Sequence, residues 1–60
     1  MKQMKQKIIP ITEARMRLFD IVEEVQDHQT YYTLTKNGRP AVVLLSHEQF
    51  ERMREKVDTK

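Results

Sequence analysis

The dipeptide Asn37-Gly38 is the feature that most restricts how this chain can fold, because segments typical of β-strands flank it on both sides. Residues 30–35 and 41–45 are rich in β-branched, aromatic and aliphatic side chains. Asn and Gly tolerate the positive φ angles of a type I′ turn, and the twist of this turn suits two antiparallel strands. The sequence therefore predicts a β-hairpin, with Lys36 and Arg39 as two cations beside its turn.

A short strand and a first helix are expected before the hairpin. The apolar run 8–11 contains Pro10, which cannot donate a hydrogen bond to a neighbouring strand, so this strand belongs at a sheet edge. Thr12 is a suitable N-cap for the helix, since its hydroxyl can accept a hydrogen bond from the first turn. Apolar side chains then recur every three or four residues: Ala14, Leu18, Ile21 or Val22, and Val25. This pattern is compatible with one helix or with two separated by a bend.

A second helix is expected after the hairpin. Ser46-His47-Glu48-Gln49 matches a capping box, in which the serine hydroxyl accepts from the Gln49 N–H and the Gln49 side chain reaches back. Phe50, Met53 and Val57 follow at helical spacing and give this helix one apolar face. The elements together predict a small α+β fold of the order β-α-β-β-α, with helices packed on a three-stranded antiparallel sheet.

Sixty residues form at most one domain, and a chain of this length buries only about 60% of its unfolded surface. No cysteine is present to form a disulfide, and two histidines without cysteine do not suggest a structural zinc site. We therefore expect a homodimer, which buries apolar surface that one chain alone exposes. Residues 1–7 are expected to form a basic N-terminal arm, 8–57 the folded domain that dimerises, and 58–60 a frayed tail.

Composition and motifs do not suggest an enzyme. Glu23 and Glu24 are neighbours on the expected helix, so they diverge as solvated charges instead of forming a catalytic pair. His28 and His47 are expected to be surface residues and not metal ligands, and no cofactor is expected. Because no segment resembles a signal peptide or a membrane-spanning helix, we expect the chain to be cytoplasmic.

The positions of the charges indicate more than their sum, since 11 Lys and Arg against 9 Asp and Glu leave a net charge of only +2. A basic arm, a helix start with arginine and a basic turn could all reach one polyanion. Arg15 and Arg17 are expected in the first turn, where a cation opposes the helix dipole unless a phosphate binds there. A surface ion pair of Arg15 with Glu13 or Asp20 is an equally good explanation. The candidate DNA-binding residues are Arg15, Lys36, Arg39, Thr12, Asn37, Arg17 and Lys7.

The chain resembles the N-terminal domain of the Phd/YefM family of antitoxins from bacterial type II toxin–antitoxin pairs. The matching segments are Ile11-Thr12-Glu13-Ala14-Arg15, Leu18 with Val25, Thr33-Leu34-Thr35-Lys36-Asn37-Gly38-Arg39-Pro40, and Ala41-Val42-Val43-Leu44-Leu45-Ser46 leading to Glu48, Gln49, Phe50 and Glu51. The resemblance implies a β-α-β-β-α unit, its first helix sometimes split, that dimerises and represses its own operon by binding the operator. The family's arginine at the start of the first helix falls on Arg15, and the basic residue that closes the second strand falls on Lys36.

Members of this family usually continue after the last helix into a flexible segment that folds onto the toxin and inhibits it. The resemblance therefore implies three partners: operator DNA, a second copy of the chain and, where a longer C-terminal segment exists, a cognate toxin of the ribonuclease type. No membrane partner is expected. The alternative function is a toxin-neutralising interaction module with secondary DNA binding, in which Phe50, Met53 and Val57 contact the partner.

Overall fold

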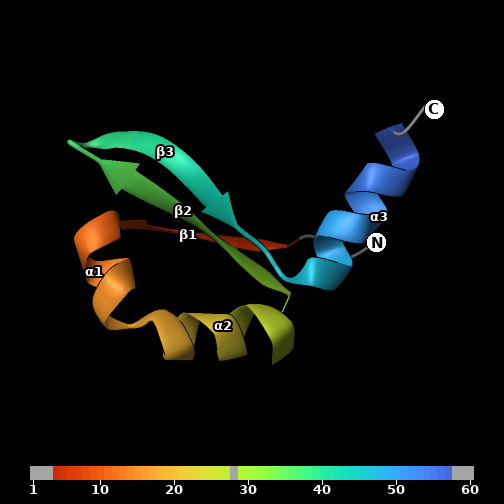
Figure 1. Cartoon of the computed structure of the whole chain (residues 1–60), viewed down its shortest axis with the longest axis horizontal. Helices are drawn as coiled ribbons and strands as arrows, with labels where there is room; N and C mark the ends of the chain where they lie inside the picture. The colour runs from red at the N-terminus through yellow and green to blue at the C-terminus, as the bar shows by residue number, and fades with distance from the viewer. Residues whose placement is uncertain (1–3, 28, 58–60) are drawn as a thin grey trace.

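The computed structural model describes residues 4–27 and 29–57, and over these it contains three strands and three helices (Figure 1). The elements are β1 (Lys5–Pro10), α1 (Ile11–Met16), α2 (Leu18–Asp27), β2 (Thr30–Lys36), β3 (Arg39–Leu44) and α3 (His47–Val57). The first helix is thus split into α1 and α2. The break falls at Arg17, whose N–H donates to the carbonyl oxygens of Glu13 and Ala14 at 3.1 and 3.2 Å.

The three strands form a mixed sheet in the order β1-β2-β3. β1 and β2 run parallel, with Lys5 opposite Thr30 and Pro10 opposite Thr35, whereas β2 and β3 are antiparallel. The expectation of a fully antiparallel sheet is therefore wrong. β1 and β2 are parallel because α1 and α2 form a helical crossover between them, and parallel strands are joined by such a crossover.

β1 begins earlier than the apolar run suggests, because it pairs with β2 along its full length. The strand starts at Lys5 and not at Ile8, and the Lys5 N–H donates to the Gln29 carbonyl oxygen at 2.9 Å. Residues 5–7 of the expected arm consequently belong to the sheet. The start of that arm, 1–3, and the expected tail, 58–60, lie outside the described residues.

The predicted hairpin between β2 and β3 is confirmed. Asn37 and Gly38 have φ angles of 55° and 77°, as a type I′ turn requires of both central residues. Lys36 and Arg39 lie opposite each other beside this turn. Pro40 is tolerated because β3 is an edge strand.

α1 and α2 cover one face of the sheet and enclose a small core (Figure 1). The buried apolar side chains are Ala14, Ile21, Val25, Tyr32 and Leu34, with Ile9 and Leu44 packed against them. Three members of the predicted helical stripe are therefore buried, whereas Leu18 is exposed. Met16 and Phe19 lie outside the stripe, and both are exposed.

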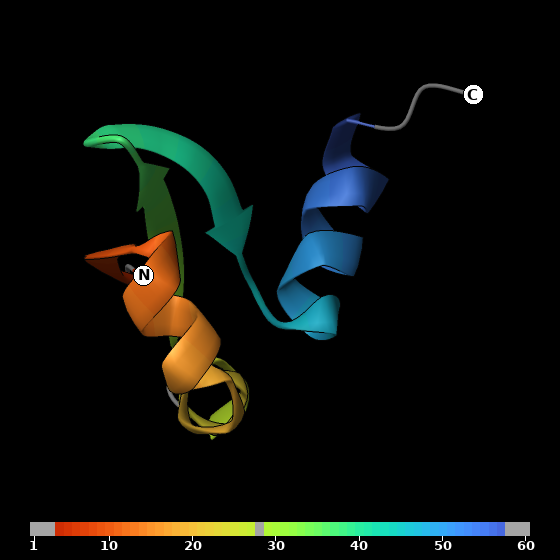
Figure 2. The ribbon, with the colours of Figure 1, turned by 60° about the vertical axis from the view of Figure 1, so that its left-hand side comes forward.

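α3 stands beside the sheet and not on it (Figure 2). Within the described part of the chain only α1 and α2 pack substantially on strands, so the expectation that the helices pack on the sheet is wrong for α3. The Gln49 N–H donates to Ser46 Oγ at 3.1 Å, which confirms the predicted N-cap, but no described hydrogen bond returns from the Gln49 side chain. Phe50 and Met53 are exposed on this helix, and the side chain of Val57 lies outside what the structure describes.

Candidate nucleic-acid interface

The parallel pairing of β1 and β2 brings the start of α1 and the β2–β3 turn to the same end of the molecule (Figure 1). β1 ends at Pro10 opposite Thr35, so α1 begins beside the last residues of β2. Thr12, Lys36 and Asn37 consequently line one shallow hollow of about 420 Å³. If β1 ran antiparallel to β2, as expected from the sequence, the helix start and the turn would lie at opposite ends.

Arg39 is the cross-strand partner of Lys36, and Arg15 lines an adjoining hollow together with Ile11. We call the set Thr12, Arg15, Lys36, Asn37 and Arg39 the basic end. All five residues are exposed or line the hollow. None of the three cations forms an ion pair within the part of the chain that the structure describes. The basic end therefore presents positive charge that no described carboxylate neutralises.

The position of Arg15 in its helix differs from the prediction. α1 has only six residues and begins at Ile11, with Pro10 as an N-cap that makes no side-chain hydrogen bond. The extended backbone of Pro10 itself ends the strand, so Thr12 is not the N-cap and Arg15 lies in the last turn of α1. A cation is favourable in a last turn, so the conflict with the helix dipole that suggested an anion site is absent.

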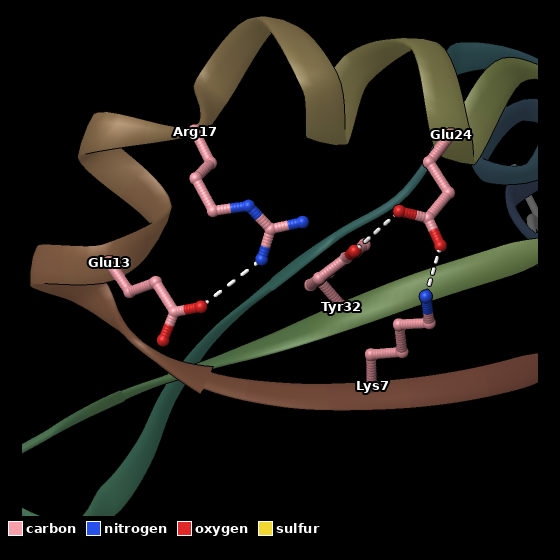
Figure 3. Close-up of polar contacts among 5 residues, drawn as sticks. All are labelled: Lys7, Glu13, Arg17, Glu24 and Tyr32. Carbon is pink, nitrogen blue, oxygen red and sulfur yellow. Dashed lines mark hydrogen bonds and ion pairs between the residues drawn. The ribbon is translucent and has the colours of Figure 1, made fainter.

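Arg17, also expected at the interface, is held by a carboxylate of its own chain. Its Nη1 donates to Glu13 Oε2 at 3.1 Å (Figure 3). This hydrogen bond raises the pKa of Arg17, which is in any case charged at physiological pH. The surface pair predicted for Glu13 thus forms with Arg17 and not with Arg15.

Lys7, Glu24 and Tyr32 form a polar network that joins β1, α2 and β2 (Figure 3). One Glu24 oxygen accepts from Lys7 Nζ, and the other accepts from the Tyr32 hydroxyl at 2.6 Å. The Lys7 hydrogen bond lowers the pKa of Glu24, while the hydrogen bonds to Glu24 raise the pKa of Lys7 and that of Tyr32. The prediction of Glu24 as a solvated charge is wrong, because the parallel register sets Lys7 opposite Tyr32 beneath it.

The sheet face that points away from α1 and α2 carries exposed apolar side chains. Val43 lies opposite Thr33, and Ile8 alternates with the core-facing Ile9, so both point to this side. Met53 of α3 completes a hollow of about 410 Å³ that Met4, Tyr31, Val43 and Leu45 also line. We call Ile8, Tyr31, Val43 and Met53 the open face. Clustered apolar exposure of this kind indicates a contact surface.

Comparison with protein families gives a match over residues 6–60 to the family described as Antitoxin Phd_YefM, type II toxin-antitoxin system. The chain belongs to the Phd/YefM antitoxin family. Antitoxin RelF of Mycobacterium tuberculosis is 37% identical over 49 residues, which cover 82% of this chain and 53% of RelF. The resemblance found in the sequence is thereby confirmed.

A solved structure supports the fold of this Phd/YefM chain. One chain of the toxin–antitoxin complex RelBE2 from Mycobacterium tuberculosis is similar to it, with a TM-score of 0.77 and 35% sequence identity. The similarity covers 87% of this chain and 56% of that chain. This Phd/YefM chain therefore spans about half the length of RelF and of the similar chain in the RelBE2 complex.

The described residues of this Phd/YefM chain hold neither a metal-binding cluster nor a membrane-spanning helix. No three His, Cys, Asp or Glu side chains in this part of the chain are placed to hold a metal ion together. No described helix is both long enough and apolar enough to cross a membrane.

Replacing Glu24 with Gln should lower the free energy of unfolding of this Phd/YefM domain. It should also make that free energy change less with pH in the acid range. The folded state lowers the pKa of Glu24 below its ordinary value of 4.5, so the stabilisation is complete above that value and is lost as the pH falls through the folded-state pKa. We expect E24Q to be less stable than wild type in urea at pH 7, with a smaller further loss at about pH 3.5. Glu23→Gln, the exposed neighbour, is the control. Equal pH dependence in wild type and E24Q would contradict this role.

Proposed function

We propose that this chain is the DNA-binding part of a type II antitoxin, which forms a homodimer, binds the operator of its own operon and represses its transcription. The observation that supports DNA binding is the basic end, where the helix start and the hairpin turn lie side by side. Arg15, Lys36 and Arg39 are exposed there without ion pairs among the described residues. Local positive charge of this kind attracts a polyanion even when the net charge of the chain is small.

Each residue of the basic end has a distinct task in this proposal. The Arg15 guanidinium can donate two parallel hydrogen bonds to a guanine edge or to a phosphate. Lys36 and Arg39 neutralise phosphates on the two sides of the turn. Thr12 and Asn37 can donate side-chain hydrogen bonds to phosphate oxygens, which fix the position of the protein on the duplex without reading sequence.

The open face supports the homodimer. Two copies that bring these faces together would bury Ile8, Val43 and Met53, which one chain alone exposes. A symmetric dimer uses the same surface on both copies, and it presents two basic ends related by a twofold axis. The operator should therefore contain two half-sites in pseudo-palindromic arrangement.

Titration of the protein against its own promoter DNA, followed by fluorescence anisotropy, tests the proposal. If Arg15 binds a phosphate, the three cations in each of two protomers make six phosphate contacts, and purely electrostatic binding through about six contacts weakens about 10³-fold between 50 and 200 mM salt. We expect a preference for the promoter over a scrambled duplex that persists at the higher salt concentration. Equal affinity for the two duplexes, or no binding, would overturn the repressor function.

Toxin neutralisation is the second candidate function, and it is favoured by the exposed Phe50 and Met53 of α3 together with the similar chain in a toxin–antitoxin complex. We propose a cognate toxin of the ribonuclease type as the partner where a longer C-terminal segment exists, and the cytoplasm as the place of both functions. Hydrogen exchange separates the two uses of α3. Amides protected in the free dimer assign the helix to dimerisation, whereas protection that appears only with toxin assigns it to neutralisation.

A further inference from the structure

Two neighbouring hollows at the basic end meet at a single side chain, Ile11. The first is the hollow at the turn, which Thr12 and Lys36 line. The second, of about 340 Å³, has an apolar lining that includes Ala14, Leu18 and Leu34, with Arg15 at its border. Ile11 lines both hollows and is 41% exposed.

The surroundings of Ile11 are cationic on two sides. Arg15 follows it by four residues and therefore lies on the same face of α1. Lys36 lines the first hollow together with Ile11. An exposed isoleucine between two cations makes no favourable contact with phosphate or water. A polyanion bound here would therefore stabilise Ile11 only by placing an apolar group against it.

Duplex DNA has such a group in its major groove, because thymine presents its C5 methyl there and is the only one of the four bases that carries a methyl group. We propose that Ile11 contacts a thymine methyl of the operator half-site and so helps to determine the operator sequence. This inference rests on the proposed DNA binding. Four residues separate Ile11 from Arg15, about 6 Å along the helix axis, and base pairs rise by about 3.4 Å. The thymine should therefore lie about one or two base pairs from the base pair that Arg15 contacts.

Deoxyuridine substitution tests this contact, because it removes only the C5 methyl. Each thymine of the operator half-site is replaced in turn, symmetrically in both half-sites, and the dissociation constant is measured by anisotropy with the unchanged protein. A methyl group transferred from water to an apolar contact corresponds to about a fourfold change in affinity, so two half-sites give about 15-fold. We expect this loss at one thymine position of each half-site and little change elsewhere.

Ile11→Ala in the protein and deoxyuridine in the operator together form a double-mutant cycle. The variant should bind the thymine and the deoxyuridine operators with equal affinity, whereas Phe19→Ala, which alters an exposed side chain outside both hollows, should keep the wild-type difference. Wild-type protein that binds the operator but senses no thymine methyl would overturn the inference and leave the proposed function intact. The inference would also be overturned, and the proposed function left intact, if Ile11→Ala still bound the thymine operator more tightly than the deoxyuridine operator. Failure of the wild type to prefer its promoter over scrambled DNA would overturn both. The deoxyuridine series with unchanged protein needs no variant, so folding of Ile11→Ala cannot confuse it.

Discussion

Arg15→Ala should weaken operator binding by about 5- to 150-fold for each half-site, which corresponds to about 1–3 kcal/mol for one specific contact. A symmetric dimer loses the contact twice, so we expect about 2–6 kcal/mol in total if the two sites are independent. The fold should be unchanged, because Arg15 is exposed and makes no hydrogen bond from its side chain among the described residues. Anisotropy titration with the operator measures the loss, and thermal unfolding verifies that the domain is intact.

Arg17→Ala is the matched control for this measurement, because the two arginines are two residues apart and differ in their partners. Arg17 is held by Glu13, and Lys7 is held by Glu24, so each would have to leave a carboxylate before it could bind a phosphate. We expect Arg17→Ala and Lys7→Ala to weaken operator binding less than Arg15→Ala does. Operator affinity unchanged in Arg15→Ala would remove this residue from the interface.

The hairpin and the core face of the helices could be predicted because their signals are local. Asn37-Gly38 specifies a turn by its backbone conformation alone, and the spacing from Ala14 to Val25 specifies a helix face. The direction of β1 is a different kind of property, since no residue within the strand encodes it. The order strand, helix, strand predicts that β1 and β2 are parallel, because a helical crossover usually joins parallel strands.

The candidate site was predictable in its residue types but not in its pairing. Arg15 and Lys36 follow from the family resemblance, but the carboxylate of Glu13 pairs with Arg17, four residues later, and not with Arg15, two residues later. The ion pair of Lys7 depends on the register of β1 against β2, which the sequence does not specify. Ile11 was expected to be part of the first strand, and only the geometry of the two hollows draws attention to it.

Val43→Asp should convert the dimer to a monomer and abolish operator binding. Val43 lies on the open face and is 56% exposed in the single chain, so a carboxylate there does not disturb the core. In the proposed dimer the same carboxylate would be buried without a partner, which costs several kcal/mol for each ion. Sedimentation equilibrium over a range of protein concentrations measures the dissociation constant of the dimer.

Phe19→Asp is the control for this substitution, because Phe19 is 87% exposed on α2 and does not belong to the open face. It places the same charge on a more exposed apolar position, so a dimer that uses the open face should tolerate it and still bind the operator. If Phe19→Asp dissociates the dimer and Val43→Asp does not, the copies meet through α2 and not through the sheet.

Thermal unfolding tests the same substitution in a second way. Because so small a core is marginal alone, Val43→Asp should melt at a lower temperature than wild type, with a midpoint independent of protein concentration. A wild-type unfolding midpoint that rises with protein concentration would show that folding of the domain is coupled to its dimerisation. Since the dimer sets the spacing of the two basic ends on DNA, folding and operator binding would then depend on the same interface.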